Sequence, residues 1–190
     1  MVYTMAKIYI DQGHNPVNPN SGAEGNGYRE QDLVYEIGVR TAEILRAAGQ
    51  DVRLSRPTPQ TQLGTSNASS LAARVNDANA WGADYFISLH ANASEISTAS
   101  GSEAFVYQLG TTAEALAENI LTQLARSTGL PNRGVFARPT LYVLRRTRMP
   151  ATLIELGFIT NTYDAALMAN QPELFAQGVA NGVLAFLGEL

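Results

Sequence analysis

Short apolar runs of strand length alternate along this chain with longer segments whose apolar residues recur every three or four positions. The strand-length runs cover 7–11, 52–54, 85–89, 103–107, 141–144 and 151–155. The helical segments cover 31–48, the stretch around Leu71, Val75 and Ala78, 113–125, a segment from about 161, and 172–187. This alternation predicts an α/β fold in three layers, with a twisted, mainly parallel sheet of about six strands and helices on both faces.

The length and composition of the chain fit one domain. Its 190 residues lie within the usual size of a domain, and 45% of them are apolar, which is enough to fill a substantial core. No internal repeat, low-complexity tract or linker divides the sequence. We therefore expect residues 1–190 to form a single domain and the protein to be a monomer.

Charge and hydropathy argue against two classes of partner. The chain has 13 basic and 17 acidic residues, a net charge of -4, and no long basic cluster, so we expect no nucleic-acid partner. No apolar run approaches the roughly 20 residues that cross a bilayer, so we expect no membrane partner. No signal-peptide pattern opens the chain. We therefore expect it to stay in the cytoplasm until it is released, unless it is a truncated piece of a longer protein.

The two histidines of the chain have similar surroundings. There is no cysteine, so a transition-metal site must use His, Asp or Glu. His14 and His90 each follow a strand-length run directly, and the carboxyl ends of parallel strands meet at one edge of a sheet. A lone histidine is more often structural, but this shared placement favours metal binding. Two His and one Glu, with a position open for water, form a ligand set that zinc uses in hydrolytic enzymes.

The third ligand should come from the loop after His14, which contains Glu24 and Glu30. We favour Glu30, because it lies at the start of a predicted helix and packing would fix its orientation. We expect Asp11 to orient His14 as a hydrogen-bond acceptor rather than to bind the metal.

Glu155 ends the apolar run 151–154 and is followed by Leu-Gly-Phe, so its carboxylate should be partly desolvated. Burial raises the pKa of a carboxyl group. A carboxylate tuned in this way beside a metal site can take a proton from water and pass it to a leaving amine. These residues therefore predict an amide hydrolase with Glu155 as the general base. The alternative is a structural ion pair of Glu155 with Arg145 or Arg146.

Four ordered motifs carry a resemblance over nearly the whole chain. They are Ile-Asp-Gln-Gly-His-Asn at 10–15, Glu30 at the opening of a helix, 81–92 with Ser-Leu-His-Ala-Asn, and 150–161 with Ile-Glu-Leu-Gly-Phe. Together they resemble the zinc-dependent N-acetylmuramoyl-L-alanine amidases. The resemblance implies one zinc ion bound by His14, Glu30 and His90, with Glu155 as the catalytic residue. It also implies peptidoglycan as substrate, cleaved between muramic acid and the first L-alanine of the stem peptide.

The chain departs from the family pattern in the loop after the first histidine. Glycines usually follow that residue, whereas this loop reads Asn-Pro-Val-Asn-Pro-Asn at 15–20 and could change substrate access. The loop after Asn92 is too short for the helical segment that covers the site in some family members. We therefore expect an open, constitutively active domain without a wall-binding module. Asn92 itself is expected either to contact substrate or to cap its turn.

The resemblance implies a role in cell-wall lysis, as an autolysin or an endolysin that is released by lysis or through a holin pore. A zinc carboxypeptidase acting on wall peptides is the alternative enzyme, and it would need a cationic pocket, for which only Arg145 to Arg148 are available. A catalytically inactive wall-binding module is the alternative from another class. An inactive module would lack a metal ligand or the general base, whereas all four residues are present in this sequence: His14, Glu30, His90 and Glu155.

Overall fold

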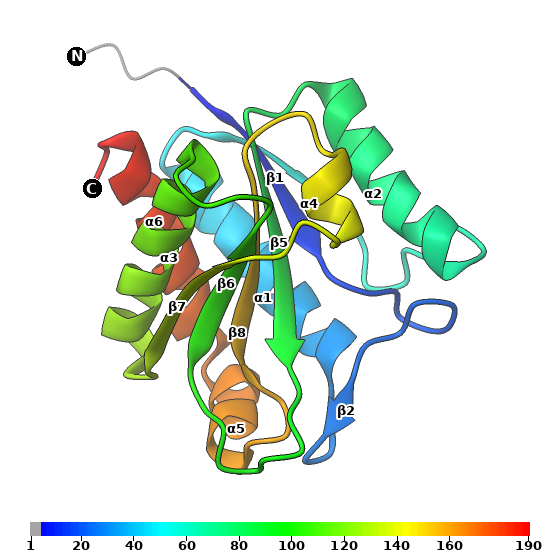
Figure 1. Ribbon diagram of the computed structural model, residues 1–190, viewed down its shortest axis with the longest axis vertical. Coiled ribbons are helices and arrows are strands. Elements are labelled where there is room, and N and C mark those ends of the chain that lie inside the picture. The colour runs from blue at the N-terminus through cyan, green and yellow to red at the C-terminus, as the bar shows by residue number, and fades with distance from the viewer. Residues whose placement is uncertain (1–4) are drawn as a thin grey trace.

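A six-stranded sheet forms the centre of the protein, as the computed structural model shows for residues 5–190 (Figure 1). Its spatial order is β4-β1-β5-β8-β6-β7. The strands are β1 (Lys7–Gln12), β4 (Asp51–Leu54), β5 (Tyr85–Asn92), β6 (Ser102–Val106), β7 (Asn132–Ala137) and β8 (Ala151–Phe158). The first four in spatial order are parallel, whereas β6 pairs antiparallel with β8 and parallel with β7. The predicted six-stranded, mainly parallel sheet is therefore confirmed.

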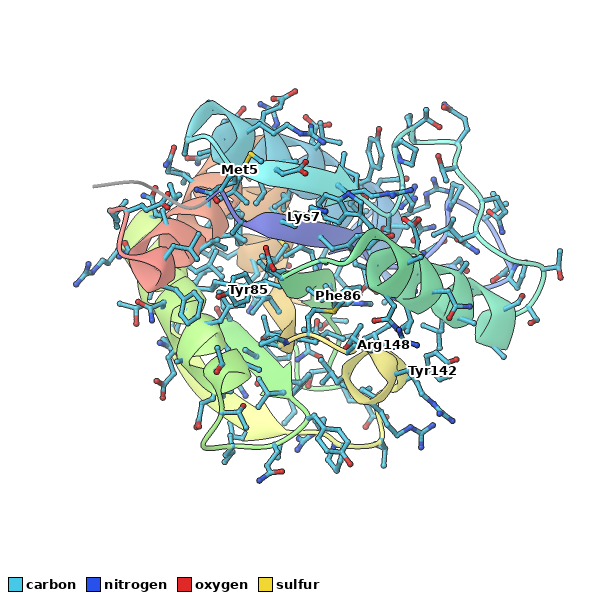
Figure 2. All side chains as sticks on the ribbon, turned by 90° about the horizontal axis from the view of Figure 1, so that it is seen from above. Met5, Lys7, Tyr85, Phe86, Tyr142 and Arg148 are labelled. Atoms are coloured by element: carbon cyan, nitrogen blue, oxygen red, sulfur yellow. The ribbon has the colours of Figure 1, made fainter. Side chains whose placement is uncertain are left out.

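Helices cover both faces of the sheet, as the view in Figure 2 shows. On one face lie α1 (Glu30–Ala47), α3 (Thr112–Thr128) and α6 (Pro172–Leu187), and on the other lie α2 (Asn67–Trp81) and α4 (Tyr142–Arg146). The short helix α5 (Thr162–Asn170) follows β8, and a small hairpin of β2 (Glu24–Gly25) and β3 (Tyr28–Arg29) precedes α1. Within residues 5–190, no helix has the length and apolar character required to span a bilayer.

Alternation along the strands divides the buried side chains into two cores. Successive side chains of a strand point to opposite faces. In β5, Ile87 and Leu89 therefore enter the larger core with α1, α3 and α6, whereas Phe86 enters the smaller core with α2 and α4. His90 follows Phe86 by four residues in β5, so its side chain points to the same face of the sheet as that of Phe86. The functional candidates on the central strands thus lie on the side of the sheet that carries α2 and α4.

The larger core depends on a close approach of α3 to α6 at Gly182. A Cβ atom built on Gly182 would lie 2.3 Å from Ile120 Cα. Real side chains do not tolerate such a distance, so this helix crossing requires a glycine.

One local prediction was wrong, and one strand was not predicted. The segment 141–144, predicted as a strand, belongs largely to α4, because a short apolar run does not distinguish a strand from one helical turn. As a helix it buries Val143 and Leu144 together in the smaller core. Strand β7 was not predicted, because it lies at the sheet edge and begins with the exposed residues Asn132 and Arg133, which break the apolar alternation.

Candidate metal centre

His14 and His90 lie side by side because their strands are neighbours. In the parallel pairing of β1 with β5, Gln12 lies opposite Leu89, and two residues later the chain reaches His14. The amide of Gly13 then donates to the Leu89 carbonyl at 3.0 Å. The imidazole centroids of His14 and His90 are 4.8 Å apart, with the rings nearly perpendicular at 79°. A Cβ atom on residue 13 would lie 2.5 Å from Cε1 of His90, so only a glycine fits at position 13 beside that imidazole.

Glu30 reaches the histidines from the first turn of α1. Its backbone amide donates to the Ala23 carbonyl at 2.9 Å, and its Oε2 accepts from the Ala23 amide at 2.9 Å. Its Oε1 accepts from the Ala91 amide at 3.0 Å, which ties the helix start to β5. The side chain is 5% exposed. The competing candidate, Glu24, is exposed in β2.

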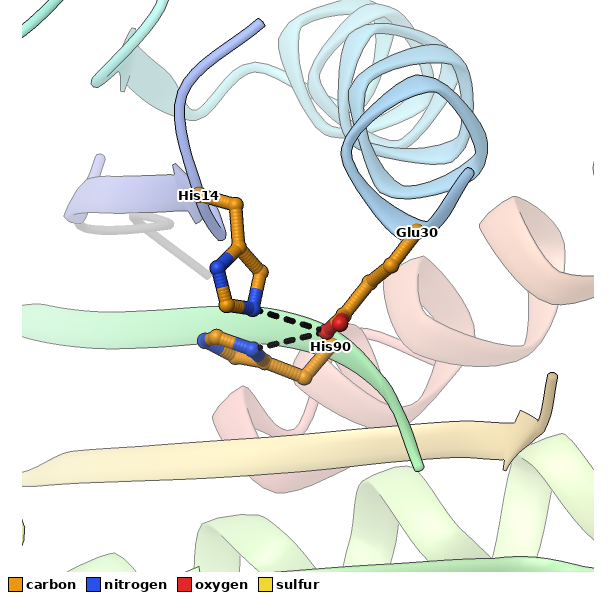
Figure 3. A group of neighbouring side chains, drawn as sticks. All are labelled: His14, Glu30 and His90. Atoms are coloured by element: carbon orange, nitrogen blue, oxygen red, sulfur yellow. Dashed lines mark hydrogen bonds and ion pairs between the residues drawn. The ribbon is translucent and has the colours of Figure 1, made fainter. Parts of the chain in front are cut away.

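The donor atoms of these three residues have the spacing of a metal site (Figure 3). Nε2 of His14 lies 3.1 Å and Nδ1 of His90 lies 3.0 Å from the same Glu30 oxygen, Oε1. All three donors lie within 4.8 Å of one another. Ligands about 2.1 Å from a tetrahedral zinc are roughly 3.4 Å apart, so the donor set and its spacing fit such an ion. Among residues 5–190, this is the one group of three such side chains whose donors converge.

The electrostatics of Glu30 keep it ionised. Burial alone would raise its pKa, but hydrogen bonds with His14 and His90, together with their charges when protonated, hold the pKa of this carboxyl well below its usual range. A carboxylate that stays anionic is the form that binds a cation.

Asp11 does not orient His14, contrary to expectation. Its carboxylate accepts from Nη1 of Arg74 at 2.6 Å and from Oγ of Ser88 at 2.7 Å. Nδ1 of His14 is buried and has no hydrogen-bond partner among the described residues. Although burial would raise the pKa of Asp11, the Arg74 charge and the hydrogen bonds from Ser88 and Arg74 lower it. The role expected for Asp11 is therefore wrong, because a buried arginine from α2 competes for its carboxylate.

Glu155 lies beside His90 on the face of the sheet that carries α2 and α4. It is registered with His90 in the β5–β8 pair and with Glu103 in the β6–β8 pair. Its Oε2 is buried without a hydrogen-bond partner among the described residues. Burial raises the pKa of Glu155 to about 8, and the carboxylates of Glu30 and Glu103 add to this effect.

The alternative of a structural ion pair for Glu155 is not supported. Arg145 and Arg146 end α4 as exposed residues, and neither forms an ion pair with Glu155 within the described part of the chain. Glu155 is thus a partly buried acid whose buried oxygen Oε2 has no partner among the described residues, which is a feature of functional carboxyl groups.

A polar network that includes Asn92 borders Glu155. Nδ2 of Asn92 donates to Oε1 of Glu103 at 2.9 Å, and Nε of Arg133 donates to Oε2 of Glu103 at 2.9 Å. Sequence reasoning missed Arg133, because it lies on the unpredicted strand β7. The sequence pattern contains no local signal that connects it with β6.

Two hollows differ in their relation to the histidines. A small apolar cavity of about 140 Å³ lies under His14 and His90, between the sheet and helices α2 and α4, and its walls include Leu71, Leu141 and Leu153. A larger hollow of about 330 Å³ lies beside the start of β8 and is lined by Tyr107, Arg145 and others, but by none of the candidate ligands. Of these two hollows, only the small cavity adjoins the candidate ligands at the carboxyl edge of the parallel strands.

This centre occurs in a chain that matches known proteins over most of its length. The profile of the N-acetylmuramoyl-L-alanine amidase family matches residues 8–185. The chain is 36% identical over 184 residues to N-acetylmuramoyl-L-alanine amidase LytC of Bacillus subtilis, covering 94% of this chain and 35% of LytC. It is 34% identical to the sporulation-specific N-acetylmuramoyl-L-alanine amidase of the same species, covering 94% of this chain and 67% of that protein.

Solved structures agree with this similarity. The catalytic domain of CwlV, an N-acetylmuramoyl-L-alanine amidase from Bacillus (Paenibacillus) polymyxa, superposes with a TM-score of 0.84 at 29% identity. The match covers 98% of this chain and 100% of that domain. The chain thus spans about a third of LytC but the whole of an isolated catalytic domain.

Proposed function

The chain belongs to the N-acetylmuramoyl-L-alanine amidase family of cell-wall hydrolases, and from this premise we propose that it cleaves the amide between N-acetylmuramic acid and L-alanine in peptidoglycan. We assign one zinc ion to His14, Glu30 and His90, and the proton transfers to Glu155. The observation that carries this proposal is the convergence of three donors close to a partly buried carboxyl group, one oxygen of which has no partner in the described chain.

The residues of the chain divide the work as follows. Zinc, when bound, supplies a Lewis acid that polarises the scissile carbonyl and makes water nucleophilic near neutral pH. Glu155 takes a proton from the attacking water while the oxygen of that water bonds to the carbonyl carbon. The same carboxyl group then delivers that proton to the L-alanine nitrogen as the carbon–nitrogen bond breaks. In the metal-free protein, burial and the neighbouring carboxylates raise the pKa of Glu155 to about 8, and the positive charge of bound zinc would lower it toward neutral pH, where the group can both accept and release a proton.

The charges around the site support an amidase over a zinc carboxypeptidase. A carboxypeptidase requires a cation near the metal to bind a terminal carboxylate. Arg145 lines the larger hollow instead, and Arg74, the cation that lines the small cavity, is 1% exposed and already paired with Asp11. Arg133, the cation nearest to Glu155 in the network described above, is held in an ion pair with Glu103.

We propose that residues 8–185 form the catalytic domain of a cell-wall lytic enzyme that acts as an autolysin or endolysin. The loop that follows β5 joins it directly to β6 without a helix over the ligands, which supports an open, constitutively active site. The side chain of Asn92 donates to Glu103 and accepts from the Ala93 amide at 2.9 Å, which supports the turn-capping role over a substrate contact.

The decisive experiment measures which bond is cut. Purified peptidoglycan should release new L-alanine amino ends when incubated with the protein, chelation should abolish this release, and added zinc should restore it. Release of reducing sugars without new amino ends would show cleavage of a glycosidic bond and would reject the proposal.

A further inference from the structure

His14 adopts a backbone conformation that needs support. Its φ of 66° lies in the left-handed region, which few residues other than glycine adopt, although histidine does so more often than most. Such conformations persist only where surrounding contacts hold them, and they cluster at functional sites. The contacts that hold His14 therefore determine where its imidazole points.

One buried arginine on α2 supplies several of those contacts, beside the hydrogen bonds that Gly13 and Asn15 make with Leu89, Asn20 and Leu63. Nη1 of Arg74 donates to Oδ1 of Asp11 at 2.6 Å and to the Gln12 carbonyl at 2.7 Å. Nη2 of Arg74 donates to the carbonyl of His14 itself and to Oδ1 of Asn15 at 3.3 Å. The guanidinium group thus binds the chain on both sides of His14, and the side chain is only 1% exposed.

The imidazole of His14 faces Glu30 through Nε2, but its other ring nitrogen, Nδ1, has no hydrogen-bond partner in the described chain. A metal-binding histidine usually donates its second ring nitrogen to a carboxylate or carbonyl, which fixes the ring. Nδ1 of His14 is buried and has no such partner. The backbone contacts of Arg74 therefore take over the orienting role that a hydrogen bond to the ring normally has.

The same arginine also connects the two histidine strands. Asp11, which Arg74 binds, accepts a second hydrogen bond from Oγ of Ser88 at 2.7 Å. Ser88 lies on β5, two residues before His90. Arg74 is therefore linked to His14 through the backbone and to the strand of His90 through a single carboxylate.

We propose that Arg74 is the positioning residue of the metal centre: it holds His14 in the left-handed conformation and thereby sets the zinc affinity. This inference rests on the proposed zinc site. Arginine is required because its planar fork reaches several carbonyl and carboxylate oxygens at once, whereas lysine offers one compact ammonium group. Arg74 does not face the substrate, so its effect should appear in metal binding without any substrate present.

The test is the zinc affinity of Arg74→Lys, measured by competition with a chromophoric chelator and without peptidoglycan. Loss of a residue that supports a ligand typically weakens metal binding 10- to 100-fold, and we expect a loss of that order. A second variant, Arg74→Gln combined with Asp11→Asn, removes both buried charges together, so that neither charge is left unpaired. It should also weaken zinc binding at least about tenfold.

Leu124→Ala is the control for general loss of stability. Leu124 is fully buried in the larger core, on the opposite face of the sheet from Arg74, so its truncation lowers the melting temperature without touching the His14 loop. We expect this variant to bind zinc with the affinity of the unchanged protein.

Three results separate the possible failures. If the unchanged protein does not bind zinc, the proposed metal site and this inference are both rejected. If it binds zinc and both Arg74 variants bind equally tightly, only the positioning role is rejected. If Leu124→Ala weakens binding as much as Arg74→Lys, the effect reflects stability and the positioning role is again rejected.

Discussion

Glu155 on β8 lies directly opposite Glu103 on β6, so two carboxyl groups are paired across an antiparallel register next to the candidate zinc ligands. Arg133 binds Glu103 from the other side at 2.9 Å. The acid that we propose as the general base therefore has two negative neighbours, Glu30 and Glu103, and the second of these is paired with Arg133.

Glu103→Gln should shift the rising limb of the pH–activity profile to lower pH. Glu155 must be deprotonated to accept a proton, and removal of the Glu103 charge lowers the pKa of Glu155. Arg133→Gln removes the positive neighbour and should shift the same limb to higher pH. The measurement is kcat/KM against pH for both variants. Shifts in the same direction for the two would contradict the role given to this pair.

Glu155→Gln should reduce hydrolysis about a hundredfold to ten-thousandfold, because glutamine cannot transfer the proton. Zinc affinity should stay within a few-fold of the unchanged protein, since Glu155 is not among the three converging donors. The rate of amino-end release and the zinc dissociation constant are the two measurements. The matched control is Glu118→Gln, at an exposed position of α3, which should retain full activity. Retention of more than about a tenth of the activity by Glu155→Gln would exclude the general-base role.

Glu155→Gln should also stabilise the metal-free protein at alkaline pH. The pKa of Glu155 is raised from 4.5 to about 8 in the folded protein. The stability that its protonated form provides is complete below about pH 4.5 and is lost as the pH rises through 8. Glutamine stays neutral, so the variant should melt at a higher temperature than the unchanged protein at about pH 9 and show little difference at about pH 5, in the presence of chelator. An equal difference at both pH values would argue against a buried, titrating Glu155.

Gly13→Ala should weaken metal binding, whereas Gly182→Ala should lower stability and leave metal binding unchanged. The added methyl group at Gly13 meets the imidazole of His90 at 2.5 Å, so zinc binding should weaken at least about tenfold. The methyl group at Gly182 meets the backbone of Ile120 at 2.3 Å and should lower the melting temperature by several degrees, with zinc affinity preserved. The two glycines lie in different parts of the fold, so each variant is the control for the other.

The sequence was sufficient to predict the elements that surround the site. Strands that end at His14 and His90 are apolar and short, and parallel strands deliver such residues to one edge, so their proximity followed from topology. The helix that begins at Glu30 was recognisable from its apolar periodicity. Strands β5 and β8 extend beyond the predicted 85–89 and 151–155, so that His90 lies within β5 and Glu155 lies in the interior of β8 instead of at its end. Strand ends are hard to predict because polar functional residues interrupt the apolar pattern.

The contacts that orient the site could not be predicted. Arg74 lies 60 residues from His14, and its partners depend on how α2 packs against the sheet. The reversed direction of β6, which brings Glu103 opposite Glu155, depends on a pairing choice that local propensity does not encode. The same limit explains the wrong role for Asp11, whose neighbours in sequence do not include the arginine that binds it.

The hairpin β2–β3 lies between His14 and Glu30 in the sequence, and Glu30 is the first residue of α1. A bound ion would join chain positions 14, 30 and 90, closing one loop of about 16 residues and another of about 60. It would therefore act as a removable cross-link between the first third of the chain and the central strand. Amide hydrogens between residues 13 and 30 should accordingly exchange with solvent faster when the ion is stripped, while those of α3 and α6 keep their protection.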